Sequence, residues 1–177
     1  LSADAASNAA SRAVINSASG VIESGTRAAE ITDYALVPID STRARPEDGS
    51  GFWIGEAVAL IVSLQIQRDL ENCVVGFLLT DRNGQQVFGT NTHYLSEPSG
   101  QLVRGTQCQC RFEMPLNFGL GSYALTLALT PDQTHLTENF HWIDRALVFE
   151  LYRPAALPYS IGVSHVPVAA TLTVDDA

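Results

Sequence analysis

Residues 57–67 alternate between apolar and other side chains with a period of two. A strand places successive side chains on opposite faces, whereas an amphipathic helix needs apolar residues three or four positions apart. The segment therefore predicts a half-buried β-strand and does not fit a helix. The apolar residues on its inner face are Val58, Leu60, Val62, Leu64 and Ile66.

Similar β-type runs recur along the chain, and turn signals rich in Gly, Pro and Asn separate them. The Asn83-Gly84 pair stands between two runs and predicts a hairpin with a type I′ turn, in which both central residues take a positive φ. The seven predicted strands cover residues 29–37, 57–67, 73–80, 87–94, 106–114, 122–130 and 145–152.

This pattern predicts an all-β fold, an immunoglobulin-like antiparallel β-sandwich, with a jelly roll as the main alternative. No Cys…Trp…Cys spacing is present, which argues against a true immunoglobulin domain. We expect residues 26–153 to form the sandwich. Residues 1–25 are rich in Ala, Ser and Asn and predict a linker that continues from a longer protein.

The last segment, residues 154–177, predicts a hinge and one more strand. Pro154 and Pro158 mark the hinge, and residues 160–174 have an extended pattern. A strand that follows a hinge can pair with its own sheet or with the sheet of a partner. We expect the second arrangement, a homodimer with an exchanged C-terminal strand.

The charge pattern excludes several functions. The net charge is −9, and all ten basic residues are Arg. A P-loop needs a Lys that reaches nucleotide phosphates, and Schiff-base chemistry needs a Lys amine, so these residues support neither. The basic residues form no cluster, so we expect no nucleic-acid partner. The three cysteines show no disulfide framework, and no apolar stretch is long enough to span a membrane.

No catalytic or metal-binding signature stands out. Residues 162–166, which read GVSHV, lack the second Gly of a nucleophile elbow. His135 and His141 lie near Asp132 and Glu138, but their spacing is not that of a structural zinc site. We therefore expect no enzyme activity, no metal and no cofactor.

Two stretches carry a resemblance to a known family. Residues 75–92 read VGFLLTDRNGQQVFGTNT, and residues 121–151 contain GSYALTLAL followed by WIDRALVFEL. Their order and spacing resemble the C-terminal domain of the Wzt-type ATP-binding subunit of O-antigen polysaccharide ABC transporters. Residues 24–31 resemble the opening segment of that domain, although Ser24 replaces the usual Phe and one extra residue precedes Glu30. The resemblance covers residues 24–152.

The resemblance implies a role in polysaccharide export. In this family an ATP-binding subunit pairs with a membrane subunit and exports a lipid-linked O-polysaccharide from the cytoplasm. Its appended C-terminal β-sandwich binds the finished polymer, often through a modification at the non-reducing end. The implied location is the cytoplasmic side of the inner membrane of a Gram-negative bacterium. The implied partners are the polymer, a second copy, and the membrane subunit, which is contacted through an ATPase domain that residues 1–25 would join.

Sugar sites combine hydrogen-bonding side chains with an aromatic surface that packs against C–H groups. The run at the end of the predicted hairpin supplies both kinds of side chain. An alternative role is left open for Asn91, because Asn near a strand end often satisfies backbone groups. The candidate residues in this run are Thr90, Asn91, Thr92, His93 and Tyr94.

Small side chains on the outward face of two other strands predict a shallow trough that would suit an extended glycan. Thr80, Thr126 and Thr130 are the polar candidates on that face, beside the small residues Gly76 and Ala128. The candidates in loops and turns are Arg82, which could pair with an anionic cap group, and His141 and Trp142. Trp142 either stacks on a sugar ring or plugs one end of the sandwich.

Two other classes of function remain open at this point. The chain could be a structural dimerisation module, which the predicted tail strand supports. It could also be an accessory or adhesion β-sandwich of an extracellular protein. The leading hypothesis is a non-catalytic carbohydrate-binding domain that gives polysaccharide export its substrate specificity.

Overall fold

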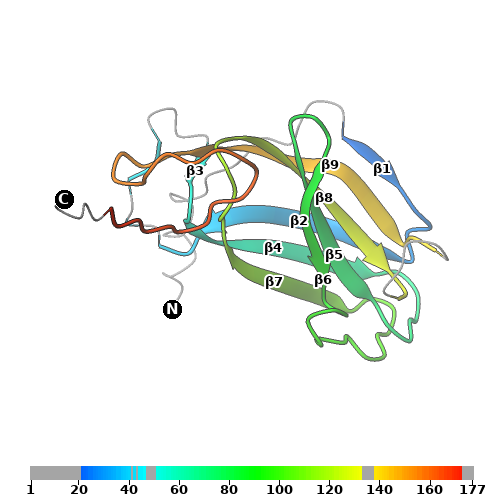
Figure 1. Cartoon of the computed structure of the whole chain (residues 1–177). Coiled ribbons are helices and arrows are strands. Elements are labelled where there is room, and N and C mark those ends of the chain that lie inside the picture. Colours follow the sequence, from blue (N-terminus) through cyan, green and yellow to red (C-terminus); the bar gives the residue numbers. More distant parts are fainter. Residues whose placement is uncertain (1–20, 41, 43, 47–50, 133–137, 173–177) are drawn as a thin grey trace, which may run out of the picture.

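The computed structural model describes residues 21–40, 42, 44–46, 51–132 and 138–172. Within these residues, nine strands form two sheets that pack face to face (Figure 1). The smaller sheet has the order β2 (Ala29–Pro38), β4 (Ala57–Ile66) and β7 (Gln107–Pro115). The larger sheet has the order β1 (Ile22–Ser24), β9 (His141–Tyr152), β8 (Gly121–Thr130), β5 (Val74–Asp81) and β6 (Gln86–Asn91), and β3 (Gly51–Trp53) pairs with β9.

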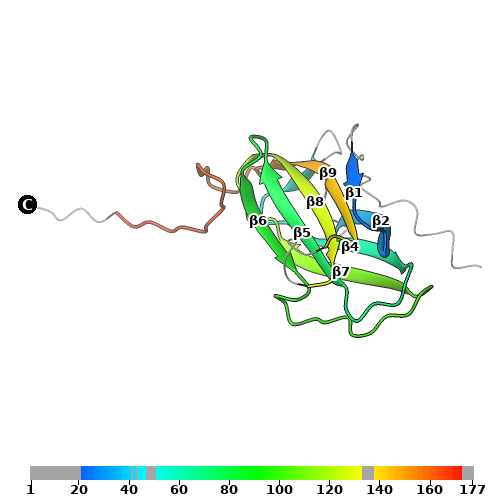
Figure 2. The ribbon, with the colours of Figure 1, turned by 90° about the vertical axis from the view of Figure 1, so that its right-hand side faces the viewer.

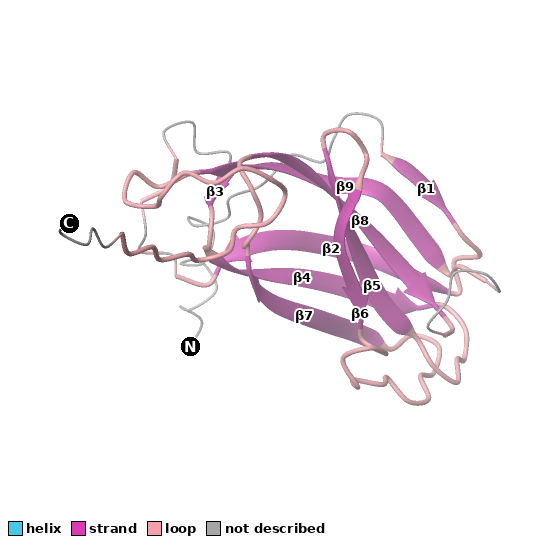
Figure 3. Cartoon of the chain, viewed as in Figure 1, coloured by secondary structure: helices cyan, strands magenta, loops and turns pink. Residues whose placement is uncertain are grey.

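The predicted all-β sandwich is confirmed. All pairs are antiparallel except β3 with β9, which is parallel. Figure 3 shows strands and loops and no helix in the described part of the chain. Consequently, none of the described segments is a helix that is long and apolar enough to cross a membrane.

The core lies between the sheets and follows the alternation read from the sequence. The five apolar residues on the inner face of β4 are at most 3% exposed. They face the larger sheet, where Leu79, Leu125 and Phe149 are at most 2% exposed. Burial of each such side chain contributes about 1.5–3 kcal/mol, so this inner layer accounts for much of the stability of the fold.

The hairpin after β5 is confirmed, but the type I′ turn is wrong. Gly84 has a φ of 79°, whereas Asn83 is not among the residues with positive φ. The Asp81 carboxylate accepts hydrogen bonds from the backbone N–H groups of Asn83 and Gln85, both at 2.9 Å. These bonds stabilise a three-residue loop in which Gly84 alone takes the left-handed conformation.

Two short strands were not predicted. β1 lies inside the range expected to be a linker, so the sandwich begins by residue 22 and not at residue 26. β3 lies inside a segment rich in Gly and Pro that the sequence indicates to be a loop. Each has three residues, which is too few to show a period of two. Residues 1–20 of the expected linker lie outside the described residues.

The C-terminal segment forms no strand of its own among the described residues. An isolated bridge joins Ser164 to Phe118, and beyond it the segment leads away from the sandwich (Figure 2). Its apolar side chains are exposed, with Ile161 at 88%, Val168 at 82% and Leu172 at 91%. The predicted strand exchange therefore stays a prediction, because a single chain does not test it.

Candidate functional site

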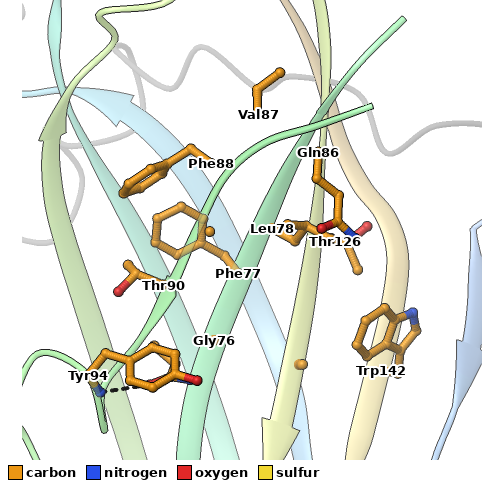
Figure 4. Close-up of a pocket in the computed structure, with 13 residues that line it drawn as sticks. Gly76, Phe77, Leu78, Gln86, Val87, Phe88, Thr90, Tyr94, Thr126 and Trp142 are labelled. Carbon is orange, nitrogen blue, oxygen red and sulfur yellow. Dashed lines mark hydrogen bonds between the residues drawn. The ribbon is translucent and has the colours of Figure 1, made fainter. Parts of the chain in front are cut away.

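A groove of about 500 Å³ crosses the outer face of the larger sheet (Figure 4). Strand register brings its central residues into one row, in which Asn91 pairs with Gly76, Gly76 with Ala128, and Ala128 with Trp142. The row crosses β6, β5, β8 and β9. The described lining residues are Gly76, Phe77, Leu78, Gln86, Val87, Phe88, Gly89, Thr90, Asn91, Tyr94, Thr126, Ala128 and Trp142.

Small residues keep the floor of the groove low, and aromatic rings stand at its sides. A Cβ on Gly76 would lie 3.2 Å from the Cβ of Asn91, so the two strands approach closely here. Figure 4 shows the Trp142 ring on one side of the groove and the Tyr94 ring on the other, whereas the Phe88 ring lies beside that of Phe77. This trough on the outward face agrees with the one expected from Gly76 and Ala128.

Asn91 and Thr92 hold the turn that ends β6. The Oδ1 atom of Asn91 accepts a hydrogen bond of 2.9 Å from the backbone N–H of Tyr94. The hydroxyl of Thr92 accepts a 3.2 Å bond from the backbone N–H of Val75. Asn91 therefore lines the groove and also has the role in the fold that was left open for it. Thr92 is 9% exposed and is not among the lining residues.

Thr126 stabilises an irregularity in β9 at the edge of the groove. Its Oγ1 donates to Asp144 Oδ1 at 3.0 Å and accepts from the backbone N–H of Arg145 at 3.2 Å. Arg145 has a φ of 50°, and the pairing of β8 with β9 shifts between Leu125 and Leu127. The register shift is a β-bulge that separates the part of β9 carrying Trp142 from the part that continues to Tyr152.

His141 lies on the opposite side of β9 from the groove, because successive residues of a strand point to opposite faces. It is 1% exposed, and its Nδ1 accepts a hydrogen bond of 2.9 Å from the backbone N–H of Ile31. Its Nε2 lies 2.6 Å from the Arg27 guanidinium and 3.3 Å from the Glu23 carboxylate. Burial and then the Arg27 charge lower the pKa of His141. His141 therefore connects β9 to β2 and does not line the groove.

The other predicted site residues also lie outside the groove lining. Thr80 is on the outward face of β5 beyond the groove, and Arg82 is exposed in the hairpin turn. Thr130 is buried at the end of β8 and donates to the backbone carbonyl of Asp132 at 2.6 Å. His93 is exposed, with its ring centroid 5.9 Å from that of Tyr94. The structure thus brings together five of the predicted residues, which are Thr90, Asn91, Tyr94, Thr126 and Trp142.

Sequence reasoning missed Gln86 as a groove residue. A register shift between Leu79 and Thr80 places Gln86 opposite Thr80, on the groove face. The alternation in β6 alone does not show this, because a bulge changes which residues face outward. Phe88 and Thr90 pair with the core residues Leu79 and Phe77, so their side chains point to the inner face of the sheet. The Phe88 ring packs there against that of Phe77, with centroids 5.9 Å apart.

The three cysteines line a separate cavity of about 460 Å³. Burial raises the pKa of Cys73 to about 12 and that of Cys110 to about 11. These two thiols are therefore protonated at neutral pH and poorly suited to act as nucleophiles. No group of three His, Cys, Asp or Glu in the described part of the chain could hold a metal ion, and His135 lies outside that part.

Comparison with known proteins gives one family and one fold. The family model described as the Wzt C-terminal domain matches residues 21–164. The solved structure described as the crystal structure of the C-terminal domain of wzt is similar with a TM-score of 0.70. The alignment covers 89% of this chain and 91% of that chain at 16% identity, so the likeness concerns the fold. No curated protein gives a significant match.

Proposed function

The chain belongs to the Wzt C-terminal domain family, and from this we propose that it is a non-catalytic carbohydrate-binding domain. It recognises an O-antigen polysaccharide at its terminally modified non-reducing end. By doing so it gives substrate specificity to the ABC transporter that exports the polymer. Its location is the cytoplasmic face of the inner membrane of a Gram-negative bacterium.

The observation that carries this proposal is the groove on the outer face of the larger sheet. Its aromatic rings suit the C–H faces of a pyranose, and its neutral amide and hydroxyl groups suit sugar hydroxyls. A groove that is open along the sheet also accommodates a polymer, whereas an enclosed cavity would admit only a small molecule. The cavity volume of about 500 Å³ provides room for one or two sugar residues.

The residues proposed for binding are the predicted ones on the groove face, together with Gln86. Trp142 stacks on a sugar ring, and Tyr94 contacts its other edge. Gln86 provides hydrogen bonds. Asn91 and Thr126 shape the groove, since the Asn91 Oδ1 and the Thr126 hydroxyl each have a partner in the protein. Thr80, Arg82 and His93 lie outside the groove lining and contact further sugar residues of a longer polymer segment.

Assembly with partners completes the proposal. The exposed apolar side chains of residues 159–172 support an exchanged C-terminal strand in a homodimer. The sandwich is of the immunoglobulin-like class, and residues 1–20 link it to an ATPase domain that contacts the membrane subunit. The exposed tail also favours the second candidate function, a dimerisation module without a glycan site.

A fluorescence titration separates the two candidates. The chain has two tryptophans, so Trp53→Phe leaves Trp142 as the reporter of the groove. Trp53 lies on β3 and is not among the groove lining, so this variant should bind the O-polysaccharide of its own host and show a change in Trp142 emission. Trp142→Ala should lose at least about tenfold in affinity, because sugar–aromatic contacts supply much of the binding energy.

The matched control is Trp53→Ala, which removes the other indole and leaves the groove intact. Circular dichroism and thermal melts establish that each variant is folded. Equal binding by Trp142→Ala and the unmodified protein would reject the groove as the glycan site. Absence of binding to the host polymer in every form would favour the dimerisation module.

A further inference from the structure

We infer that the groove selects an uncharged sugar that carries an apolar substituent, such as a 6-deoxy, O-methyl or O-acetyl group, and excludes an anionic cap. This inference rests on the proposed function and names the class of terminal sugar. It concerns the region of the groove between Trp142 and Tyr94.

The described lining of the groove carries no charged side chain: none of these residues is Arg, Asp, Glu or His. The Asp144 carboxylate touches the groove lining, because it accepts a hydrogen bond of 3.0 Å from the Thr126 hydroxyl. The net charge of the whole chain is −9. A phosphate or carboxylate in the groove would therefore find no described cation among the lining residues and would lie near a carboxylate of the same sign.

The surface that faces the ligand is apolar. The Tyr94 ring lines the groove and is 63% exposed. The floor between Tyr94 and Trp142 is built from the apolar residues Gly76 and Ala128. A methyl or acetyl group placed there would be removed from water, which contributes about 0.8 kcal/mol for each buried carbon.

The polar groups on the groove face of β6 are neutral. They include the side-chain amides of Gln86 and Asn91. Such groups match sugar hydroxyls or an ester carbonyl one for one. They cannot neutralise a carboxylate, and a charge that is taken out of water without a partner carries a large penalty. An anionic terminal group is consequently bound more weakly than its neutral counterpart.

The test uses sugars that differ only at C6. The probes are the methyl glycosides of D-fucose, D-galactose and D-galacturonic acid, which carry a methyl, a hydroxymethyl and a carboxylate at that atom. A second series in the manno configuration uses D-rhamnose, D-mannose and D-mannuronic acid. Binding to the full chain is measured by saturation-transfer NMR and by emission of the Trp53→Phe variant. In the series that binds, the deoxy sugar should bind best and the uronate at least about tenfold more weakly.

A variant that introduces a positive charge sharpens the test. Gln86 is exposed at the edge of the groove, so Gln86→Arg would place a guanidinium beside the ligand. This variant should raise the affinity for the uronate relative to that for the deoxy sugar by about tenfold. An unchanged ratio of the two affinities would count against a ligand bound beside residue 86.

The outcomes separate this inference from the proposed function. If the uronate binds the unmodified protein as well as the deoxy sugar does, the groove is a sugar site but the inference is wrong. If no sugar of either series binds and the host polymer does not bind either, the proposed function fails and the inference fails with it. If the deoxy sugar binds best and Trp142→Ala removes that binding, both stand.

Discussion

At the residue scale, the partners of His141 determine its protonation state. Its Nδ1 accepts the Ile31 N–H, so a proton added to Nδ1 would displace that hydrogen bond. Burial and the Arg27 charge both lower the pKa of His141, whereas Glu23 and Glu30 raise it, and lowering prevails.

We therefore expect acid to destabilise the domain through His141. Because its pKa is lower in the folded state than the ordinary value of 6.5, the unfolded chain binds the proton more readily. The contribution of neutral His141 to the free energy of unfolding is fully present above pH 6.5 and is lost as the pH falls below that value. His141→Asn keeps an acceptor near the Nδ1 position and cannot titrate, so thermal melts from pH 7.5 to 5 should decline more steeply for the unmodified protein. Parallel curves would contradict this assignment.

The cysteines give a second prediction at this scale. Cys73 is 3% exposed and burial raises its pKa to about 12. Its thiol should react with iodoacetamide at pH 7.5 only after denaturant is added, as followed by mass spectrometry of peptides. Rapid labelling of Cys73 in the folded protein would show that the edge of the sandwich opens more readily than this packing allows.

At the element scale, the bulge in β9 depends on Thr126. Thr126→Val keeps the shape of the side chain but removes both hydrogen bonds of its hydroxyl, to Asp144 and from Arg145. We expect a loss of about 1–3 kcal/mol in the free energy of unfolding, measured by denaturant titration. The control is Thr106→Val, at a partly exposed position before β7, which should change stability by less than about 0.5 kcal/mol. Equal effects would mean that the bulge does not need the hydroxyl.

Elements that depend on packing were predictable, and elements that depend on local irregularity were not. β4 and β8 followed from alternation because one face of each is buried in the core. β1 and β3 are too short for a period to appear, and the turn at Asn83 depends on the Asp81 carboxylate. The groove was partly predictable for the same reason. The small residues on β5 and β8 indicated it, whereas the bulge in β6 concealed Gln86.

At the scale of the whole molecule, the exposed tail predicts the oligomeric state. Ile161, Val168 and Leu172 are more than four-fifths exposed, which is unusual for apolar side chains unless a partner covers them. We expect light scattering at micromolar concentration to give twice the chain mass of 19.0 kDa. A variant that ends at Arg153 should be a folded monomer. A monomeric full chain would contradict the exchanged strand and leave the groove unaffected.

The central claim is that the outer face of the larger sheet holds the glycan, and an NMR titration tests it most directly. Isotope-labelled protein is titrated with the purified O-polysaccharide of its host, and the backbone amide shifts are mapped onto the structure. We expect the largest shifts at Asn91, Gly76 and Ala128, in the row that ends at Trp142. Shifts that instead gather at the cysteine-lined cavity, or at the outer face of the smaller sheet, would contradict it.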